Sequence, residues 1–177
     1  AKDILESKYD TVIIATGSKP KVFALGDDNR VYTAADVLLE KENPGDTTAV
    51  IGGGLVGCET ALWLSQQGKK VTLIEALDSL LAINGPLCHA NKDMLEKLVP
   101  YNGVDVVTGA KVTSFKDGKL TYETREGDFK KIDCDSVVLA IGYKEENDLY
   151  HQLEFEVPEI YLLGDAKKVS NIMYGIW

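Results

Sequence analysis

The sequence predicts an α/β fold in which a parallel sheet carries an additional antiparallel meander. Three consecutive segments predict the parallel sheet. Residues 47–51 are an apolar, β-branched run that leads into a glycine cluster, residues 55–67 are an amphipathic segment of helical length, and residues 70–74 are a second apolar run. Gly68 stands where a glycine commonly ends a helix. A strand, a helix and a strand in this order are the βαβ unit of a parallel sheet.

Two elements are predicted before this βαβ unit. Residues 9–17 form a strand that ends in a small-residue turn at Gly17, and their β-branched run predicts a position buried in a sheet. Thr33 is a candidate N-cap for a helix over residues 34–42, which the Asn-Pro-Gly sequence at 43–45 ends.

The elements after the βαβ unit continue the alternation and then change to antiparallel strands. A helix over residues 87–98, ended by residues 100–103, leads to a third parallel strand over 104–107. The next three runs are closely spaced and have glycine-containing turns between them, which predicts a meander with strands at 111–115, 119–124 and 130–133.

Two further strands are predicted towards the end of the sequence. Residues 136–142 are an apolar run that ends in Gly142, as the first strand ends in Gly17. A glycine at such a strand end lets the backbone lie against a flat ring or a phosphate. An ordinary glycine turn would explain Gly17 or Gly142 if either stood alone. Residues 159–166 form a strand that ends in Gly-Asp, and residues 172–177 begin a helix.

The glycine cluster has the spacing Gly52-x-Gly54-x-x-Gly57. Gly52 allows the tight turn from strand to helix, Gly54 leaves the backbone open to a pyrophosphate, and Gly57 allows the helix to pack closely on the strand. Any tight βα turn can contain glycines, so the spacing alone does not separate a dinucleotide site from an ordinary turn. The candidate contacts of this turn with a pyrophosphate are Gly52, Gly53, Gly54, Leu55, Val56 and Gly57.

Glu75 favours the dinucleotide site. It ends the second strand of the βαβ unit, about 20 residues past the glycines, where a carboxylate accepts hydrogen bonds from the ribose hydroxyls of adenosine. Residues 76–83, which begin with the candidate contact Ala76, contain no Lys or Arg, and Glu75 and Asp78 repel a 2′-phosphate. NADH is therefore favoured over NADPH. FAD also uses an acid at this position, so NAD and FAD both remain candidates at this corner.

The length, the net charge and the apolar content of the sequence disfavour several classes of protein. The 177 residues suffice for one domain or a small two-part body with a core. The net charge of -9 disfavours binding to nucleic acid or to an anionic membrane, since both require a basic surface. No apolar stretch approaches the roughly 18 residues of a membrane span, and the first residues are not those of a signal peptide, so we expect a cytoplasmic location.

The cysteines and histidines predict neither a metal site nor a disulfide framework. Cys58, Cys88 and Cys134 are far apart and form no CxxC pair. Cys58 falls in the first turn of the predicted helix, where the helix dipole favours a lowered thiol pKa, but a buried and inert thiol is the preferred interpretation. His89 and His151 lie in polar segments and are expected at the surface.

Four motifs carry a resemblance to a known family: ATG at residues 15–17, GGGLVGCE at 52–59, AIG at 140–142 and YLLGDA at 161–166. In order and spacing they resemble the flavoprotein reductases with two dinucleotide-binding domains, the pyridine nucleotide-disulfide reductase superfamily, in which an NAD domain is inserted into an FAD domain. Within it the sequence is most similar to the C-terminal part of the 2,4-dienoyl-CoA reductase and enoate reductase group. These are NADH:flavin oxidoreductases and multidomain relatives of old yellow enzyme.

The resemblance implies a domain organisation. A Rossmann-like NAD(H)-binding domain would occupy residues 47–142, with FAD-domain flanks over 1–20 and 143–177. A connecting segment with a short helix would occupy residues 21–46.

The resemblance also implies roles for matching residues. Glu59 matches an acid that lies close to the nicotinamide end of NADH, and Gly142, with Ile141 before it, would line the ribose of the nicotinamide. Asp165 matches an acid that contacts FAD near its ribityl chain, and Gly17 matches a turn close to that flavin.

Features of this family that the sequence lacks predict a fragment. No glycine-rich βαβ unit precedes the first strand, so the main half of the flavin site is missing. The family's barrel with its FMN, its cysteines for an iron-sulfur cluster and its proton-donating residues are missing as well.

We therefore expect the NADH-binding module of a flavin-dependent oxidoreductase. In the intact enzyme, a hydride would pass from NADH to FAD and on to FMN, which reduces an activated carbon-carbon double bond. The fragment alone is expected to have no catalytic residue and no activity, and its expected partners are NADH and the missing FAD and barrel domains. A stand-alone NAD-dependent dehydrogenase and a non-catalytic NADH-sensing domain are the alternatives.

Overall fold

The computed structural model describes residues 1–26, 29–82 and 88–170, and its chain forms two compact units. Unit 1 takes Ala1–Lys19 and the chain from Tyr143 onward, and unit 2 is the continuous segment Pro20–Gly142. No helix among the described residues is long and apolar enough to cross a membrane.

Unit 2 is built around a parallel sheet of five strands. The strands at 47–51 and 70–74 and the third parallel strand near 104–107 are confirmed. A further strand, β3, comes from the segment before the βαβ unit and was not predicted. In spatial order the strands are β3 (Val31–Thr33), β10 (Ser136–Leu139), β4 (Thr47–Ile51), β5 (Lys70–Ile74) and β6 (Asp105–Val107).

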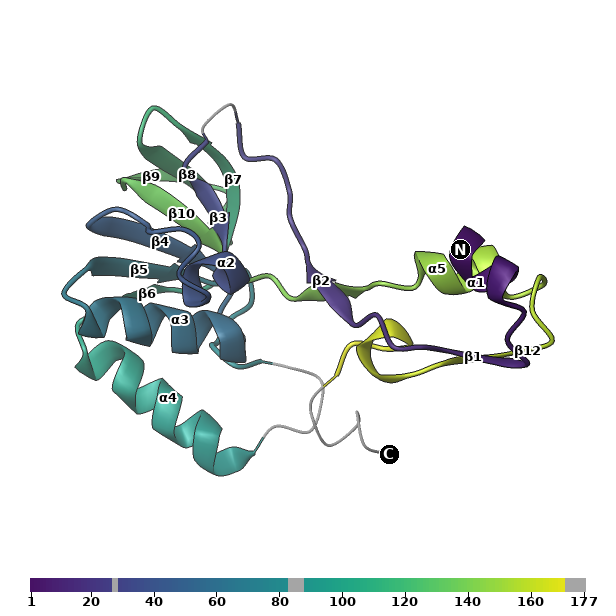
Figure 1. Cartoon of the computed structure of the whole chain (residues 1–177). Helices are drawn as coiled ribbons and strands as arrows, with labels where there is room; N and C mark the ends of the chain where they lie inside the picture. The colour runs from purple at the N-terminus through teal and green to yellow at the C-terminus, as the bar shows by residue number, and fades with distance from the viewer. Residues whose placement is uncertain (27–28, 83–87, 171–177) are drawn as a thin grey trace. The chain divides into compact units, whose positions relative to one another are not determined.

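Helices cover one face of this sheet (Figure 1). α3 (Leu55–Gln66) lies on β4 and β5, and α4 (His89–Tyr101) packs beside α3. Val50, the fourth residue of β4, is buried in one core with Leu64 of α3 and Leu95 of α4.

The antiparallel meander covers the other face of the sheet (Figure 1). Ala49 and Ile51, the neighbours of Val50 on β4, are buried in a second core with Phe115 of the meander. The central strands are therefore apolar on both faces, as in a three-layer α/β fold. The predicted meander is confirmed, with strands β7 (Ala110–Lys116), β8 (Lys119–Thr124) and β9 (Phe129–Asp133).

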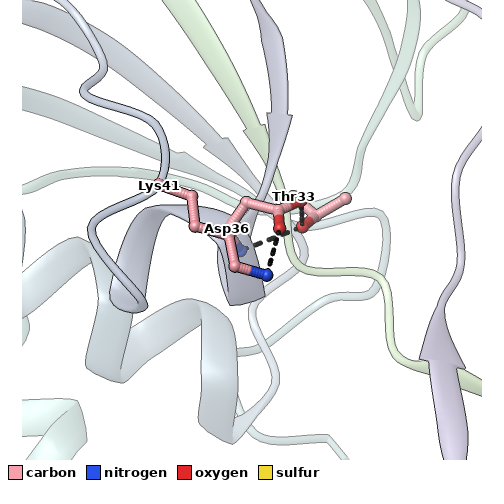
Figure 2. A network of polar contacts seen from close by, with 3 residues as sticks. All are labelled: Thr33, Asp36 and Lys41. Carbon is pink, nitrogen blue, oxygen red and sulfur yellow. Dashed lines mark hydrogen bonds and ion pairs between the residues drawn. The ribbon is translucent and has the colours of Figure 1, made fainter.

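Thr33 caps α2 (Ala34–Leu38) as predicted. Its Oγ1 accepts a hydrogen bond of 3.1 Å from the backbone N–H of Asp36 and donates one of 2.7 Å to the Asp36 carboxylate, which also pairs with Lys41 at 3.7 Å (Figure 2). The prediction that this helix continues to residue 42 was wrong. The backbone leaves the helix after Leu38, and Glu40 adopts a left-handed φ of 56° that no helix can continue.

The ends of the two longer helices show how glycine and proline act here. Gly68 follows α3 with a left-handed φ of 83°, which agrees with its predicted role at the helix end. α4 contains Pro100 and ends at Tyr101, later than predicted. Pro100 has no N–H to donate to the carbonyl oxygen four residues earlier, and the helix ends one residue after it.

Unit 1 contains a two-stranded parallel sheet of β1 (Thr11–Ile14) and β12 (Glu159–Leu162), in which Val12 lies opposite Ile160. Two short helices and a 3-10 turn complete it: α1 (Lys2–Ser7), α5 (Asp148–Leu153) and η1 (Gly164–Ala166). The segments that connect the units along the chain, β2 (Ser18–Pro20) and β11 (Tyr143–Glu145), pair as a separate two-stranded sheet. The helix predicted at 172–177 lies outside the described residues.

The prediction that the first strand is buried in a sheet was wrong for half of its residues. Val12 and Ile14 are buried in a core with Leu153, but Ile13 is 60% exposed. β1 pairs with β12 alone, and successive side chains of a strand point to opposite faces. One face of β1 therefore packs on unit 1 and the other remains open.

Candidate functional site

The predicted glycine turn and the predicted acid lie at the same edge of the parallel sheet. Gly52 follows β4, Glu75 follows β5 and Ala140 follows β10, so all three lie at the carboxyl ends of neighbouring strands. β5 and β6, which follow β4 in the sequence, lie on one side of β4 in the sheet, whereas β10 and β3 lie on the other side. The strand order therefore reverses at β4. Ligands of open α/β sheets bind outside the carboxyl ends of the strands at such a reversal of strand order.

Gly52 occupies a position that excludes a side chain. Its φ is 106°, and a Cβ atom at this position would lie 2.5 Å from the carbonyl oxygen of Ala140. Its own N–H donates a hydrogen bond of 2.8 Å to the carbonyl oxygen of Ile74. The turn is therefore closed by backbone on both sides, towards β10 and towards β5.

Gly57 allows α3 to approach this turn. A Cβ atom on Gly57 would lie 1.7 Å from the carbonyl oxygen of Gly52, which is far inside van der Waals contact. Gly54 is the N-cap of α3, and no side chain caps the helix there. The N–H groups of Leu55 and Val56, in the first turn, have no partners inside the helix, as at the start of any α-helix. This turn has the shape and the donors of an anion site.

The carboxylate of Glu75 is held by two backbone N–H groups. Oε2 accepts a hydrogen bond of 2.5 Å from the N–H of Gly53, and Oε1 accepts one of 2.7 Å from the N–H of Leu77. Leu81 donates a further hydrogen bond of 2.8 Å to the carbonyl oxygen of Gly53. The segment after β5 therefore folds onto the glycine turn, and the N–H of Gly53 is directed at Glu75.

The other residues predicted for unit 2 lie around this edge or on its helix. Ile141 is half-buried against the core below the meander, and the exposed Gly142 adopts a φ of 90°. The carbonyl oxygen of Gly142 accepts a hydrogen bond of 2.9 Å from the N–H of Lys21. Glu59 is exposed on α3, and Ala76 is exposed directly after Glu75.

The two residues predicted on the flavin side, Gly17 and Asp165, both belong to unit 1. Gly17 has a φ of 78°, and Ser18 beside it donates a hydrogen bond of 3.1 Å from Oγ to Oδ2 of Asp165. Oδ1 of Asp165 accepts one of 3.1 Å from the N–H of Ser170. The structure thus brings the segments at Gly17 and Asp165 together.

Arg125 is a residue near the site that the sequence reasoning missed. It follows β8 in the meander, and its guanidinium forms an ion pair with the carboxylate of Asp78, in the segment after Glu75. Residues 76–83 themselves contain no Lys or Arg, and no sequence signal links this segment to the turn after β8. Only the packing of the meander on the sheet brings the two together.

Cys58 is fully buried behind the glycine turn. Burial, with smaller contributions from the charges of Glu75 and Glu59, raises the pKa of its thiol to about 12. The thiol donates a hydrogen bond of 3.4 Å to the carbonyl oxygen of Gly53. The predicted burial of this thiol is therefore confirmed, and the alternative of a lowered pKa is wrong. In the part of the chain that the structure describes, no group of three His, Cys, Asp or Glu residues is arranged to hold a metal ion.

Comparisons with known proteins match the chain over nearly its whole length. A family model described as pyridine nucleotide-disulphide oxidoreductase matches residues 2–176. The sequence is 47% identical to a cinnamate reductase of Clostridium sporogenes over 99% of this chain and 26% of that protein. It is 34% identical to an NADH oxidase of Thermoanaerobacter brockii over 99% of this chain and 28% of that protein.

Among solved structures, the fold is similar to that of a 2-naphthoyl-CoA reductase in complex with 2-naphthoyl-CoA. The TM-score is 0.87 at 26% identity, over 99% of this chain and 26% of that one. The chain thus spans about a quarter of the length of each of these relatives.

Proposed function

Because the chain belongs to the pyridine nucleotide-disulphide oxidoreductase family, we propose that it is the NADH-binding module of a larger flavin-dependent oxidoreductase. The observation that carries this proposal is the hydrogen bond from the N–H of Gly53 to the carboxylate of Glu75, which holds Glu75 beside the turn at Gly52. We call this part of the sheet edge the Glu75 corner. It joins an anion site to an acceptor for ribose hydroxyls at the reversal of strand order.

The residues of this corner fit the adenosine and pyrophosphate parts of NADH. The pyrophosphate would lie on the N–H groups of Leu55 and Val56, beside the bare backbone of Gly54. Each carboxylate oxygen of Glu75 already accepts one backbone hydrogen bond. Each oxygen has capacity for a second, so the carboxylate can accept from the ribose hydroxyls without losing its own anchors.

The nicotinamide end would lie towards the end of β10. Ile141 and Gly142 follow that strand. By resemblance, Glu59 would lie near the same end of the dinucleotide. When bound, NADH supplies a hydride for FAD. The chain's own residues hold the dinucleotide in position and exclude water, which is the contribution of protein to such chemistry.

Unit 1 is proposed to be the flank of an FAD domain whose main part lies elsewhere in a longer chain. The parallel pairing of β1 with β12 supports this, because it joins strands from the two ends of the sequence around unit 2. Gly17 and Asp165 would lie on the flavin side. The proposed boundaries are 1–20 and 143–177 for the flanks, 21–46 for the connecting segment and 47–142 for the NAD(H)-binding domain.

The reaction proposed for the parent enzyme is reduction of an activated carbon-carbon double bond. Cinnamate and 2-naphthoyl-CoA appear in the names of two of the relatives. In both compounds a carbonyl group is conjugated with the carbon-carbon bonds beside it, which belong to an alkene in cinnamate and to an aromatic ring in 2-naphthoyl-CoA. FMN and an iron-sulfur cluster would belong to domains outside this sequence, by resemblance alone.

Calorimetric titration of the purified 177-residue chain with NADH, NADPH and FAD tests the proposal. We expect NADH to bind, Glu75→Ala to weaken that binding by about tenfold or more, and NADPH and FAD to bind poorly. Glu42→Ala is the matched control, because Glu42 is an exposed acid just before β4, at the opposite edge of the sheet. Binding of FAD in place of NADH would assign the glycine turn to the other nucleotide and overturn the proposal.

A further inference from the structure

A cation lies at the adenosine end of the proposed nucleotide site. The guanidinium of Arg125, from the turn between β8 and β9, pairs with the carboxylate of Asp78. Both side chains are largely exposed, at 66% for Arg125 and 59% for Asp78, so a ligand at this corner can reach them.

Backbone hydrogen bonds fix the place of Arg125 relative to Glu75. The N–H of Ala110 donates a hydrogen bond of 3.0 Å to the carbonyl oxygen of Glu75, and the N–H of Gly109 donates one of 2.8 Å to that of Leu77. The stem of Arg125 lies across Gly109, since a Cβ atom on that glycine would lie 3.4 Å from Cγ and Cδ of the arginine. Arg125 is therefore held against the segment that follows the ribose-binding acid.

The carboxylates of Glu75 and Asp78 have different partners. Glu75 is engaged by backbone N–H groups, and Asp78 is engaged by Arg125. A third carboxylate, that of Glu126, accepts a hydrogen bond from its own backbone N–H, and this bond is the main cause of its lowered pKa. The positive charges of Lys130 and Arg125 lower the pKa further, to a smaller extent. Asp78 is the carboxylate that forms an ion pair with the guanidinium in the described part of the chain.

A 2′-phosphate would need the donors that Asp78 occupies. The guanidinium of arginine recognises phosphate and carboxylate with the same fork of N–H groups. With Asp78 in place, a phosphate must displace a carboxylate and lie beside a second one. Without it, the fork is free and the negative charge of the corner falls by one unit.

We propose that the Asp78–Arg125 pair determines the preference for NADH over NADPH, with Asp78 withholding from a 2′-phosphate the arginine that would bind it. This inference rests on the proposed NADH site. It adds Arg125, from the meander, to the residues that decide which nucleotide binds.

The test measures dissociation constants of NADH and NADPH for the 177-residue chain at low ionic strength. We expect Asp78→Asn to tighten NADPH binding by about tenfold, because it releases a charge-assisted donor pair, and to leave NADH binding within about twofold. The double variant Asp78→Asn with Arg125→Gln should lose the gain. Added salt should reduce the gain as well, since the groups are exposed.

Asp133→Asn is the matched control. Asp133 pairs with Lys119 at 2.6 Å at the other end of the same hairpin, and both side chains are exposed. This variant changes the net charge by the same amount, so an equal gain in NADPH affinity would overturn the inference in favour of a general charge effect. A gain that survives Arg125→Gln would overturn it as well.

The outcomes separate this inference from the proposed function. If the wild-type chain binds NADH through Glu75 but Asp78→Asn leaves NADPH affinity unchanged, the specificity inference fails and the NADH module stands. If the wild-type chain binds neither dinucleotide, both fail. Retention of NADH affinity in each variant serves as the check that the variant is folded.

Discussion

Ile13 of β1 lies opposite Tyr161 of β12 in a parallel register, and the two side chains are 60% and 48% exposed. Both residues belong to predicted strands that, by the family resemblance, are parts of one domain with a second domain inserted between them. Their pairing is the contact expected of such an insertion. Their exposure leaves an open apolar face on the smaller unit.

The two faces of β1 are expected to differ in their effect on stability. Ile14 is 3% exposed and buried in the core of unit 1, so Ile14→Ala should destabilise that unit by about 3 kcal/mol. Ile13→Ala is the matched control and should cost less than about 1 kcal/mol. Amide hydrogen exchange in β12 measures both, and equal effects would contradict the exposure of Ile13.

Gly57→Ala is expected to disrupt the glycine turn. The added Cβ atom would lie 1.7 Å from the carbonyl oxygen of Gly52, so α3 must move and the cost should reach about 3 kcal/mol, with loss of NADH binding. Gly127→Ala is the control. Gly127 has a φ of 84° in open space, so only the backbone strain of about 1 kcal/mol applies. Urea unfolding compares them, and equal costs would argue against close packing at Gly57.

The Cys58 thiol is expected to give the chain a particular pH dependence. Its folded-state pKa of about 12 lies above the ordinary value of 9.0, so the unfolded chain loses this proton first as pH rises. The free energy of unfolding should therefore fall above about pH 9, by up to about 1.4 kcal/mol per pH unit. Cys58→Ala should flatten this slope in urea unfolding measured between pH 8 and about pH 10. An unchanged slope would contradict the burial of the thiol.

Native Cys58 should also resist alkylation. At about pH 8 iodoacetamide should modify the exposed Cys88 and leave Cys58 and Cys134 unmodified, since both of these are buried and burial raises both pKa values. Mass spectrometry of tryptic peptides identifies the modified residue. Denatured chain is the control, in which all three should react.

Thr33→Ala should cost about 1 kcal/mol, because it removes the acceptor for the N–H of Asp36 at the start of α2. Thr113→Ala on β7 is the control, as the Thr113 side chain is exposed. Urea unfolding of unit 2 measures both changes, and a smaller loss for Thr33→Ala than for the control would argue against the cap shown in Figure 2.

The 177-residue chain should bind NADH without oxidising it. No catalytic residue is predicted in the sequence, and the proposed electron acceptor is a flavin held largely by other parts of the parent enzyme. Loss of absorbance of NADH with ferricyanide as acceptor is the assay. Turnover above the rate without protein would contradict the proposed role as a binding module.

Most of unit 2 was predictable because its signals are local. The strands at Thr47–Ile51 and Lys70–Ile74 are apolar runs bounded by turn residues, and a strand buried on both faces requires such a run. Gly52 and Gly57 could be assigned roles because few backbone geometries require glycine twice at this spacing. The structure then shows the close contacts that these roles imply.

The features that were missed depend on tertiary contacts or on very short segments. β3 has three residues, all half-buried, and therefore neither alternation nor an apolar run marks it. α1 has no buried residue, so its sequence has no apolar stripe. The pairing of Arg125 with Asp78 joins the meander to the sheet, and no local pattern indicates which turn the packing brings to which strand.

The hydrogen bond from Lys21 to Gly142 has a consequence for the order of folding. It closes unit 2 at its two ends, which are also the points where the chain enters and leaves it. Pairing β1 with β12 from an unfolded chain requires closure of a loop that spans most of the sequence, and this closure costs conformational entropy and slows folding. Once unit 2 has folded, only the segments before Pro20 and after Gly142 remain to be brought together. Folding of the larger unit first would therefore shorten the loop that the pairing of β1 with β12 has to close.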